Sequence, residues 1–236
     1  MMRRIAITAI AIARTAAADP PLDHVVTAPT AWLPADGTAY GSASLDHRGE
    51  TAIDLGYALG GLAEVELGAD HDVRACEPSC TPILEERAAF RLGAHQDAWF
   101  AGMPAIALGV RATIGTPARR VGEAYLVASR VLAFARVHAG VEAIDAGDGA
   151  SRPGVVVRPL AALELVPPQY PKTTVVGDIA WLARFGGAPG TEWIAGWGVR
   201  YQALRWGSIE LDVRHREGEG LAQSTVMVRV NGVWAR

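Results

Sequence analysis

The sequence of 236 residues contains no long apolar run, and this absence limits how the chain can meet a membrane. Half of the residues (50%) are hydrophobic, yet no stretch approaches the ~20 consecutive apolar residues that a membrane-spanning helix requires. Phenylalanine is scarce, with 4 residues, whereas the core of a β-sandwich usually buries more aromatic side chains. A transmembrane helix is therefore excluded, and a sandwich is disfavoured.

An excess of basic charge is lacking as well. The chain carries 22 Lys and Arg against 25 Asp and Glu, a net charge of -3. Three of the arginines, Arg3, Arg4 and Arg14, fall in an N-terminal stretch that is expected to be removed, which leaves the rest more acidic. Because a protein that grips nucleic acid presents a basic face to the phosphates, no nucleic-acid partner is expected.

Cysteine is rare, with 2 residues, Cys76 and Cys80, both in the stretch HDVRACEPSCTP. In an exported protein such a pair is expected to form a local disulfide, because oxidising compartments favour these bonds. A zinc site that recruits His71 is a weak alternative, since a second cysteine pair and an H-x-H spacing are both missing. Reduced loop thiols are the other alternative, and no metal is expected.

Recognised catalytic motifs are also missing. The sequence has no G-x-S-x-G elbow, no H-E-x-x-H and no phosphate-binding loop. Lipid-acting enzymes of the outer membrane use a serine as nucleophile, a histidine as base and an acidic or amide partner. Residues of these types do occur in the sequence, but they are scattered. They are Ser129 with His138 and Glu142, or Ser44 with His47. We expect no catalytic residues and no cofactor, and a lipid-acting barrel enzyme is the second alternative.

The N-terminus, MMRRIAITAIAIARTAAADPP, has the parts of a secretory signal peptide. Arg3 and Arg4 precede an apolar run from Ile5 to Ala13, and an A-x-A cleavage site follows at Ala16 to Ala18. Residues 1–18 are therefore expected to be a signal peptide that exports the chain. The alternative is an amphipathic or disordered N-terminal arm.

Apolar and polar residues alternate along the chain with the period of β-strands. Between Thr51 and Asp70, two such runs are joined by Gly60 and Gly61, which is the pattern of a β-hairpin. The same reading predicts about twelve strands, each near the ~9–11 residues that a tilted strand needs to cross a bilayer. Ten strands are the alternative, if 123–144 is divided differently. The predicted strands are 38–46, 51–59, 63–70, 85–95, 105–115, 123–132, 134–144, 155–166, 173–184, 192–202, 206–214 and 224–233.

The links between these strands sort by length. The odd-numbered links are mostly long and the even-numbered ones are mostly short. Short turns on the side of the chain ends and longer loops on the other side are typical of transmembrane barrels, whereas a soluble sandwich has no reason to sort its links. The links far from the chain ends are 47–50, 71–84, 116–122, 145–154, 185–191 and 215–223, and the others are 60–62, 96–104, 133, 167–172 and 203–205.

The two faces of the strands differ in polarity. In the strand 206–214, for example, Leu211 lies between Glu210 and Asp212. Alternation alone permits apolar residues inside a sandwich or outside a barrel, but four tryptophans close to strand ends favour the membrane, where such rings sit at the interface. These are Trp181, Trp193, Trp206 and Trp234. The polar face is then predicted to line the lumen with Glu64, Glu66, Glu85, Arg87, Arg91, Arg111, Arg136, Glu142, Arg158, Glu164, Asp178, Arg200, Glu210 and Asp212.

Two stretches resemble a known family. TAPTAWLPADGTAYGSASLD, from Thr27 to Asp46, is similar to the P-T-A-x-x-L-P-x-G-T segment that leads into the first strand of some porin-like barrels. The C-terminal VMVRVNGVWAR resembles the aromatic-ended last strand that the outer-membrane assembly machinery reads, although Ala235 and Arg236 follow Trp234 here. The resemblance implies an all-β, antiparallel up-and-down transmembrane β-barrel over 38–236, with 19–37 as a segment leading into it.

The function expected from this pattern is passive. A bacterial outer-membrane barrel would act as a porin-like channel or as a structural surface protein, in contact with outer-membrane lipid and, during insertion, with the assembly machinery. Twelve strands should enclose a narrow, partly filled lumen, whose charges either line a pore for small solutes or close it by pairing. A secreted soluble β-sandwich that binds a partner is the alternative from another class.

Overall fold

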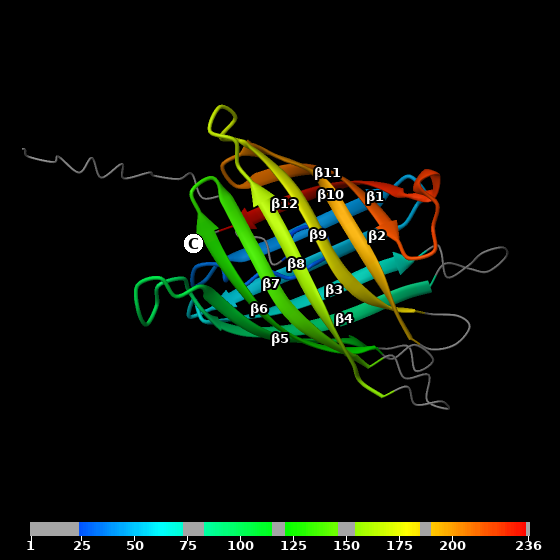
Figure 1. Cartoon of the computed structure of the whole chain (residues 1–236), viewed down its shortest axis with the longest axis horizontal. Helices are drawn as coiled ribbons and strands as arrows, with labels where there is room; N and C mark the ends of the chain where they lie inside the picture. Colours follow the sequence, from blue (N-terminus) through cyan, green and yellow to red (C-terminus); the bar gives the residue numbers. More distant parts are fainter. Residues whose placement is uncertain (1–23, 73–82, 115–120, 146–153, 185–189, 235–236) are drawn as a thin grey trace, which may run out of the picture.

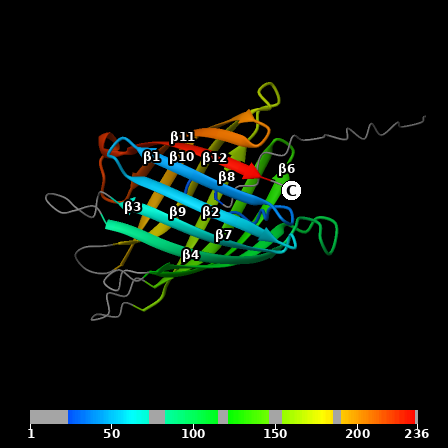
Figure 2. The same cartoon turned by 180° about the vertical axis from the view of Figure 1, so that it is seen from behind.

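The computed structural model describes residues 24–72, 83–114, 121–145, 154–184 and 190–234. These residues form a closed barrel of antiparallel strands, in which each strand pairs with its neighbours in sequence and β1 closes the ring against β12 (Figures 1 and 2). The strands are β1 (Ala39–Asp46), β2 (Thr51–Leu59), β3 (Ala63–Asp72), β4 (Ile83–Ala94), β5 (Ala105–Ile114), β6 (Gly122–Leu132), β7 (Ala135–Asp145), β8 (Val156–Leu165), β9 (Thr173–Arg184), β10 (Gly190–Leu204), β11 (Gly207–Arg216) and β12 (Thr225–Trp234).

The twelve-strand prediction is confirmed, and the ten-strand alternative is wrong. Residues 122–145 divide into β6 and β7 at a tight turn, where Ala133 adopts a φ of 53°. Three residues join β2 to β3, and the N–H of Leu62 donates to the carbonyl of Leu59 over 3.3 Å. Gly60 and Gly61, at the centre of this turn, have φ values of 62° and 65°, a left-handed conformation that glycine adopts without steric cost. The predicted signal peptide and the pair Cys76 and Cys80 lie outside the described residues.

The outer face of the barrel is apolar. Leu55, Leu67 and Leu211 have exposed fractions of 60%, 62% and 56%, whereas Glu210 and Asp212 beside Leu211 are fully buried. This polarity is the reverse of a soluble sandwich, so the sandwich alternative is wrong, and the exterior suits lipid. The described residues include no helix that is long and apolar enough to cross a membrane.

Aromatic side chains gather near both ends of the barrel. At the end with the long links, Trp181 and Trp193 are directly paired across β9 and β10. At the opposite end, Trp206, Trp234 and Trp99 are exposed, the last of them in the connection between β4 and β5. Tryptophan rings with one apolar and one polar side favour the interface between lipid and water, so the two groups fit the edges of a membrane-spanning band.

The barrel wall changes its pairing beside Pro159. The β8–β9 ladder includes Ala161 to Leu165 and stops before Pro159, which lacks a backbone N–H. The N–H of Trp181 donates instead to Glu142 over 2.7 Å, and its indole N–H donates to the carbonyl of Pro159 over 2.9 Å. The guanidinium of Arg158 stacks 4.6 Å from the centroid of a Trp181 ring.

The N-terminal segment, here defined as residues 24–34, lies inside the barrel. Val25, Val26, Ala28 and Ala31 are buried at 1% exposure or less, and a local reversal brings His24 and Pro29 into a β-bridge. They pack against small or medium apolar side chains of the inner wall. These are Ala105, Ala107, Val127, Leu160, Ala162, Val176, Ala180, Ile194 and Met227.

Candidate functional site in the barrel lumen

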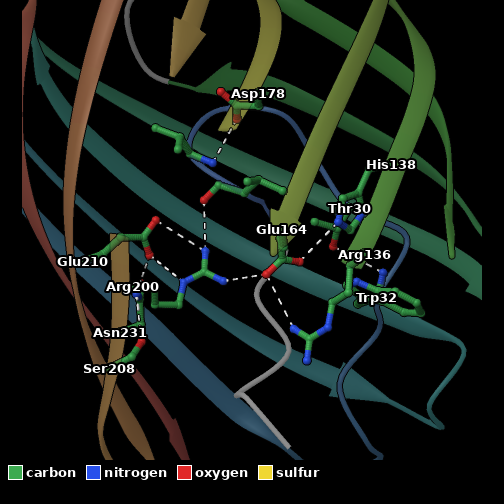
Figure 3. A network of polar contacts seen from close by, with 12 residues as sticks. Thr30, Trp32, Arg136, His138, Glu164, Asp178, Arg200, Ser208, Glu210 and Asn231 are labelled. Atoms are coloured by element: carbon green, nitrogen blue, oxygen red, sulfur yellow. Dashed lines mark hydrogen bonds and ion pairs between the residues drawn. The ribbon is translucent and has the colours of Figure 1, made fainter. Parts of the chain in front are cut away.

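One network of buried charges joins β8, β10, β11 and β12 across the lumen wall. Arg200 lies between two carboxylates, with its Nε 2.8 Å from Glu210 and its Nη1 3.0 Å from Glu164 (Figure 3). Arg229 approaches Glu210 from the other side, with 3.5 Å between Nη1 and Oε1. All four side chains are at most 4% exposed, and pairing compensates for the removal of their charges from water.

The same network extends through Glu164 to a histidine and a serine. Glu164 lies 3.5 Å from Nη1 of Arg136 and 3.2 Å from Nε2 of His138 (Figure 3). On its other side, Nδ1 of His138 lies 2.7 Å from the Oγ of Ser129. The acidic partner of His138 is therefore Glu164, and not Glu142, which the sequence offered as one candidate.

The hydroxyl of Ser129 is occupied by the N-terminal segment. Its Oγ accepts the backbone N–H of Ala31 over 2.8 Å, and Ser129 is 1% exposed. Since the oxygen accepts from Ala31, its own proton is available to His138, which assigns the other ring proton to Nε2, facing Glu164. Ser129, His138 and Glu164 thus form a hydrogen-bonded row on the barrel wall, and Ser129 binds the N-terminal segment through the N–H of Ala31.

A second ion pair holds the segment from the opposite wall. Arg91 on β4 lies 2.7 Å from Glu64 on β3, and Glu64 also accepts the hydroxyl of Tyr40 over 2.9 Å. The two Nη groups of Arg91 donate to the carbonyls of Thr30 and Trp32, over 2.7 Å and 2.9 Å. The indole of Trp32 then meets the ring of His138 edge-on, with 6.1 Å between centroids.

The tip of the segment is fixed by one carboxylate. Asp178 on β9 accepts the N–H groups of Val26, Thr27 and Ala28, over 2.9, 2.5 and 2.7 Å, all at the same Oδ2. Three successive N–H groups that converge on an anion form a nest, a backbone shape suited to negative charge. Asp178 thus holds the reversal of the chain in the middle of the lumen.

A vestibule lined by polar and charged side chains lies beyond the tip, toward the long links. It is a cavity of about 290 Å³ whose floor includes His24, Val26 and Thr27. Its lining carries charges of both signs, and several are paired. The pairs are Arg87 with Asp54 and Asp70, Arg111 with Glu123, Arg214 with Glu50, and Arg216 with Glu192.

The structure distributes the fourteen predicted lumen residues over three settings. Eight are buried inside the barrel: Glu64, Arg91, Glu142, Glu164, Asp178, Arg200, Glu210 and Asp212. Glu66, Glu85, Arg87 and Arg111 are half-buried and line the vestibule, and half-buried Arg136 contacts Glu164. Arg158 differs, because it stacks on Trp181 and donates to Thr191 over 3.1 Å. Among the described residues, neither carboxylate oxygen of Asp212 has a hydrogen-bond partner.

Sequence reasoning missed the occupant of the lumen. Residues 19–37 were expected only to lead into the first strand, whereas 24–34 run inside the barrel and contact five strands through Asp178, Arg200, Arg229, Arg91 and Ser129. One signal in the sequence could have revealed it. Val25 and Val26 are two adjacent apolar residues outside every predicted strand, so they have no place on the lipid-facing surface and indicate burial elsewhere.

Within the described ranges, no three or more His, Cys, Asp or Glu side chains are grouped to hold a metal ion.

Comparisons with known proteins place the fold. No family model and no curated protein match the sequence. Among solved structures, a KdgM porin superposes with a TM-score of 0.58 at 8% identity, over 83% of this chain and 98% of that one. A KdgM porin in complex with disordered oligogalacturonate gives 0.57 at 7% identity, over 83% and 98%. A Salmonella typhi outer membrane phospholipase (OMPLA) dimer with bound calcium gives 0.51 at 12% identity, over 86% and 92%. At these identities the likeness shows the fold alone, and the expected all-β architecture of a closed antiparallel barrel is confirmed.

Proposed function

We propose that this chain is a porin-like channel of the bacterial outer membrane that passes small polar solutes and catalyses no reaction. One observation carries the proposal: an apolar outer face encloses a charged interior that opens into a vestibule of about 290 Å³. An outward apolar band with an inward polar lining is the arrangement of transmembrane barrels. The similarity in fold to a KdgM porin supports a channel.

The vestibule favours solutes that are small and hydrophilic. Its lining brings Arg87, Arg111 and Arg214 together with carboxylates such as Asp54 and Glu123. Charged groups on both sides compensate a polar solute for part of its lost hydration. The neighbour in complex with oligogalacturonate supports solute passage as a role for a barrel of this shape.

A lipid-acting enzyme is disfavoured by the position of its candidate nucleophile. Ser129 is 1% exposed and its hydroxyl contacts Ala31 and His138 inside the barrel, so a lipid ester on the outer face does not reach it. A nucleophile must meet the reacting carbon of its substrate before any role can be given to it.

The channel is tested by conductance of the full chain in planar bilayers, after fractionation and a heat-modifiability gel have established an outer-membrane barrel. We expect small ionic currents whose cation-to-anion selectivity changes in Arg87→Glu, because Arg87 lines the vestibule. The matched control, Leu211→Val on the lipid face, should leave selectivity unchanged. Protein found in the aqueous periplasm, or a selectivity that Arg87→Glu does not move, would contradict the proposal.

A further inference from the structure

The lumen wall recognises the N-terminal segment through its main chain. Asp178 accepts three backbone N–H groups, and Ser129 accepts a fourth. Three arginines donate to backbone carbonyls of the segment: Arg200 to Val25 over 3.2 Å, Arg229 to Val26 over 2.8 Å, and Arg91 to Thr30 and Trp32. Contacts of this kind depend on the peptide backbone and not on which side chains it bears.

The arginines that hold the segment have partners on the wall as well. Arg91 pairs with Glu64, and Arg200 and Arg229 pair with Glu210. Departure of the segment therefore leaves these three buried charges compensated. Asp178 differs, because within the described residues every hydrogen bond to its carboxylate comes from the segment. Departure of the segment would leave the Asp178 carboxylate without these N–H donors, which a new peptide occupant can supply.

The wall is also shaped for small side chains at the tip. A Cβ added at Gly196 would lie 2.7 Å from the Cβ of Val26 and 2.6 Å from Oδ1 of Asp178, so only glycine permits this approach. Around Val25, Val26 and Ala28 the inner wall is lined largely by alanines and short aliphatic side chains. A ligand in this place needs successive free N–H groups and small apolar side chains.

We propose that the lumen is a binding site for oligopeptides, occupied in this state by residues 24–34 of the same chain. A peptide of small apolar residues that offers three successive N–H groups to Asp178 replaces the segment at this site. Such peptides are the solute class of the proposed channel, and the inference deepens that function and rests on it.

The test releases the segment while leaving the wall intact. Val26→Pro with Ala28→Pro, in the full chain, removes two of the three N–H donors to Asp178. Val26→Ala with Ala28→Gly is the matched control, because it trims the same side chains and keeps both N–H groups. A labelled synthetic peptide of residues 24–34 is then added, and its binding is followed by fluorescence anisotropy in detergent.

We expect the peptide to bind the proline variant at least tenfold more tightly than wild type or the control, because in those two the tethered segment competes. Methylating the peptide nitrogens of residues 26–28 should weaken binding about tenfold or more, since it removes hydrogen bonds to a charged group. A shuffled peptide that keeps the small apolar residues should bind within a few-fold. Equal binding of the methylated and unmethylated peptides would overturn the proposal.

A second variant provides an independent test of the site, because it changes the wall and not the segment. Conductance measurements then distinguish failure of the binding site from failure of the proposed channel. Gly196→Val fills the place of Val26 from the wall, so it should release the segment and also refuse the peptide. If the peptide binds the proline variant but no current is seen in bilayers, the proposed binding site is supported and the proposed channel function is contradicted. Current in the proline variant that the peptide fails to reduce, together with absent binding, would reject the site and retain the channel.

Discussion

Arg200 and Glu210 face each other directly across β10 and β11, with 2.8 Å between Nε and Oε2, and both side chains are at most 2% exposed. Glu164 and Arg229 continue the pairing on either side. Charges of opposite sign thus alternate across the wall, which is the condition under which a barrel tolerates them away from water. The pairing also explains why these residues are costly to change singly.

Arg200→Ala should destabilise the barrel by about 3–5 kcal/mol, because it leaves Glu164 and Glu210 buried with fewer partners. Arg87→Ala is the matched control: Arg87 is 25% exposed, and its loss should cost roughly 0–1 kcal/mol. Equilibrium urea unfolding in lipid vesicles measures both. If the two variants lost similar amounts of unfolding free energy, burial would not determine how much each ion pair contributes to stability.

Leu211→Arg should cost about 2–4 kcal/mol if this residue lies near the bilayer midplane, because a charge is placed in lipid. The neighbouring positions supply the control for orientation. Leu211→Cys should react with a lipid-phase probe, and Glu210→Cys should not, since Glu210 is fully buried inside. Reaction of Leu211→Cys with an aqueous reagent alone would contradict the membrane-facing assignment.

Ser129→Ala should weaken folding by about 1–3 kcal/mol, because it leaves the N–H of Ala31 and Nδ1 of His138 without their buried partner. Ser44→Ala, on the half-buried lining of the vestibule, should have a smaller effect. Unfolding midpoints compare the two variants. Ester hydrolysis by wild type that Ser129→Ala abolishes would instead restore the enzymatic alternative.

The pair Cys76 and Cys80 remains a prediction of the sequence. If the two thiols are oxidised, their reduction should barely change the free energy of unfolding, because the stabilisation from a cross-link grows with the length of the loop it closes. Mass spectrometry of protein purified from the envelope, with thiols alkylated before digestion, measures the state of both cysteines. Alkylation of both would rule out the disulfide.

The choice of the acidic partner of His138 shows what local sequence leaves open. Glu142 lies on the same strand, four residues away, which separates the two positions by roughly 13 Å along an extended chain. Glu164 lies on β8, and the register pairs it with Arg136 and pairs His138 with Ala162, so Glu164 is a diagonal neighbour of the ring. Ser129, by contrast, is the direct cross-strand partner of His138. Register depends on hydrogen bonds between strands, which periodicity within a strand does not reveal.

The sequence by itself determined the strands, their apolar and polar faces and the side of the barrel on which the long links lie. These are local properties, because side chains alternate along any extended strand and tight turns need residues such as Gly60 and Gly61. Only the tertiary structure decided which charges pair and that residues 24–34 run inside the lumen. Val26 and Asp178 are 152 residues apart, and their contact exists because closing the ring creates an interior in which a buried carboxylate accepts backbone N–H groups.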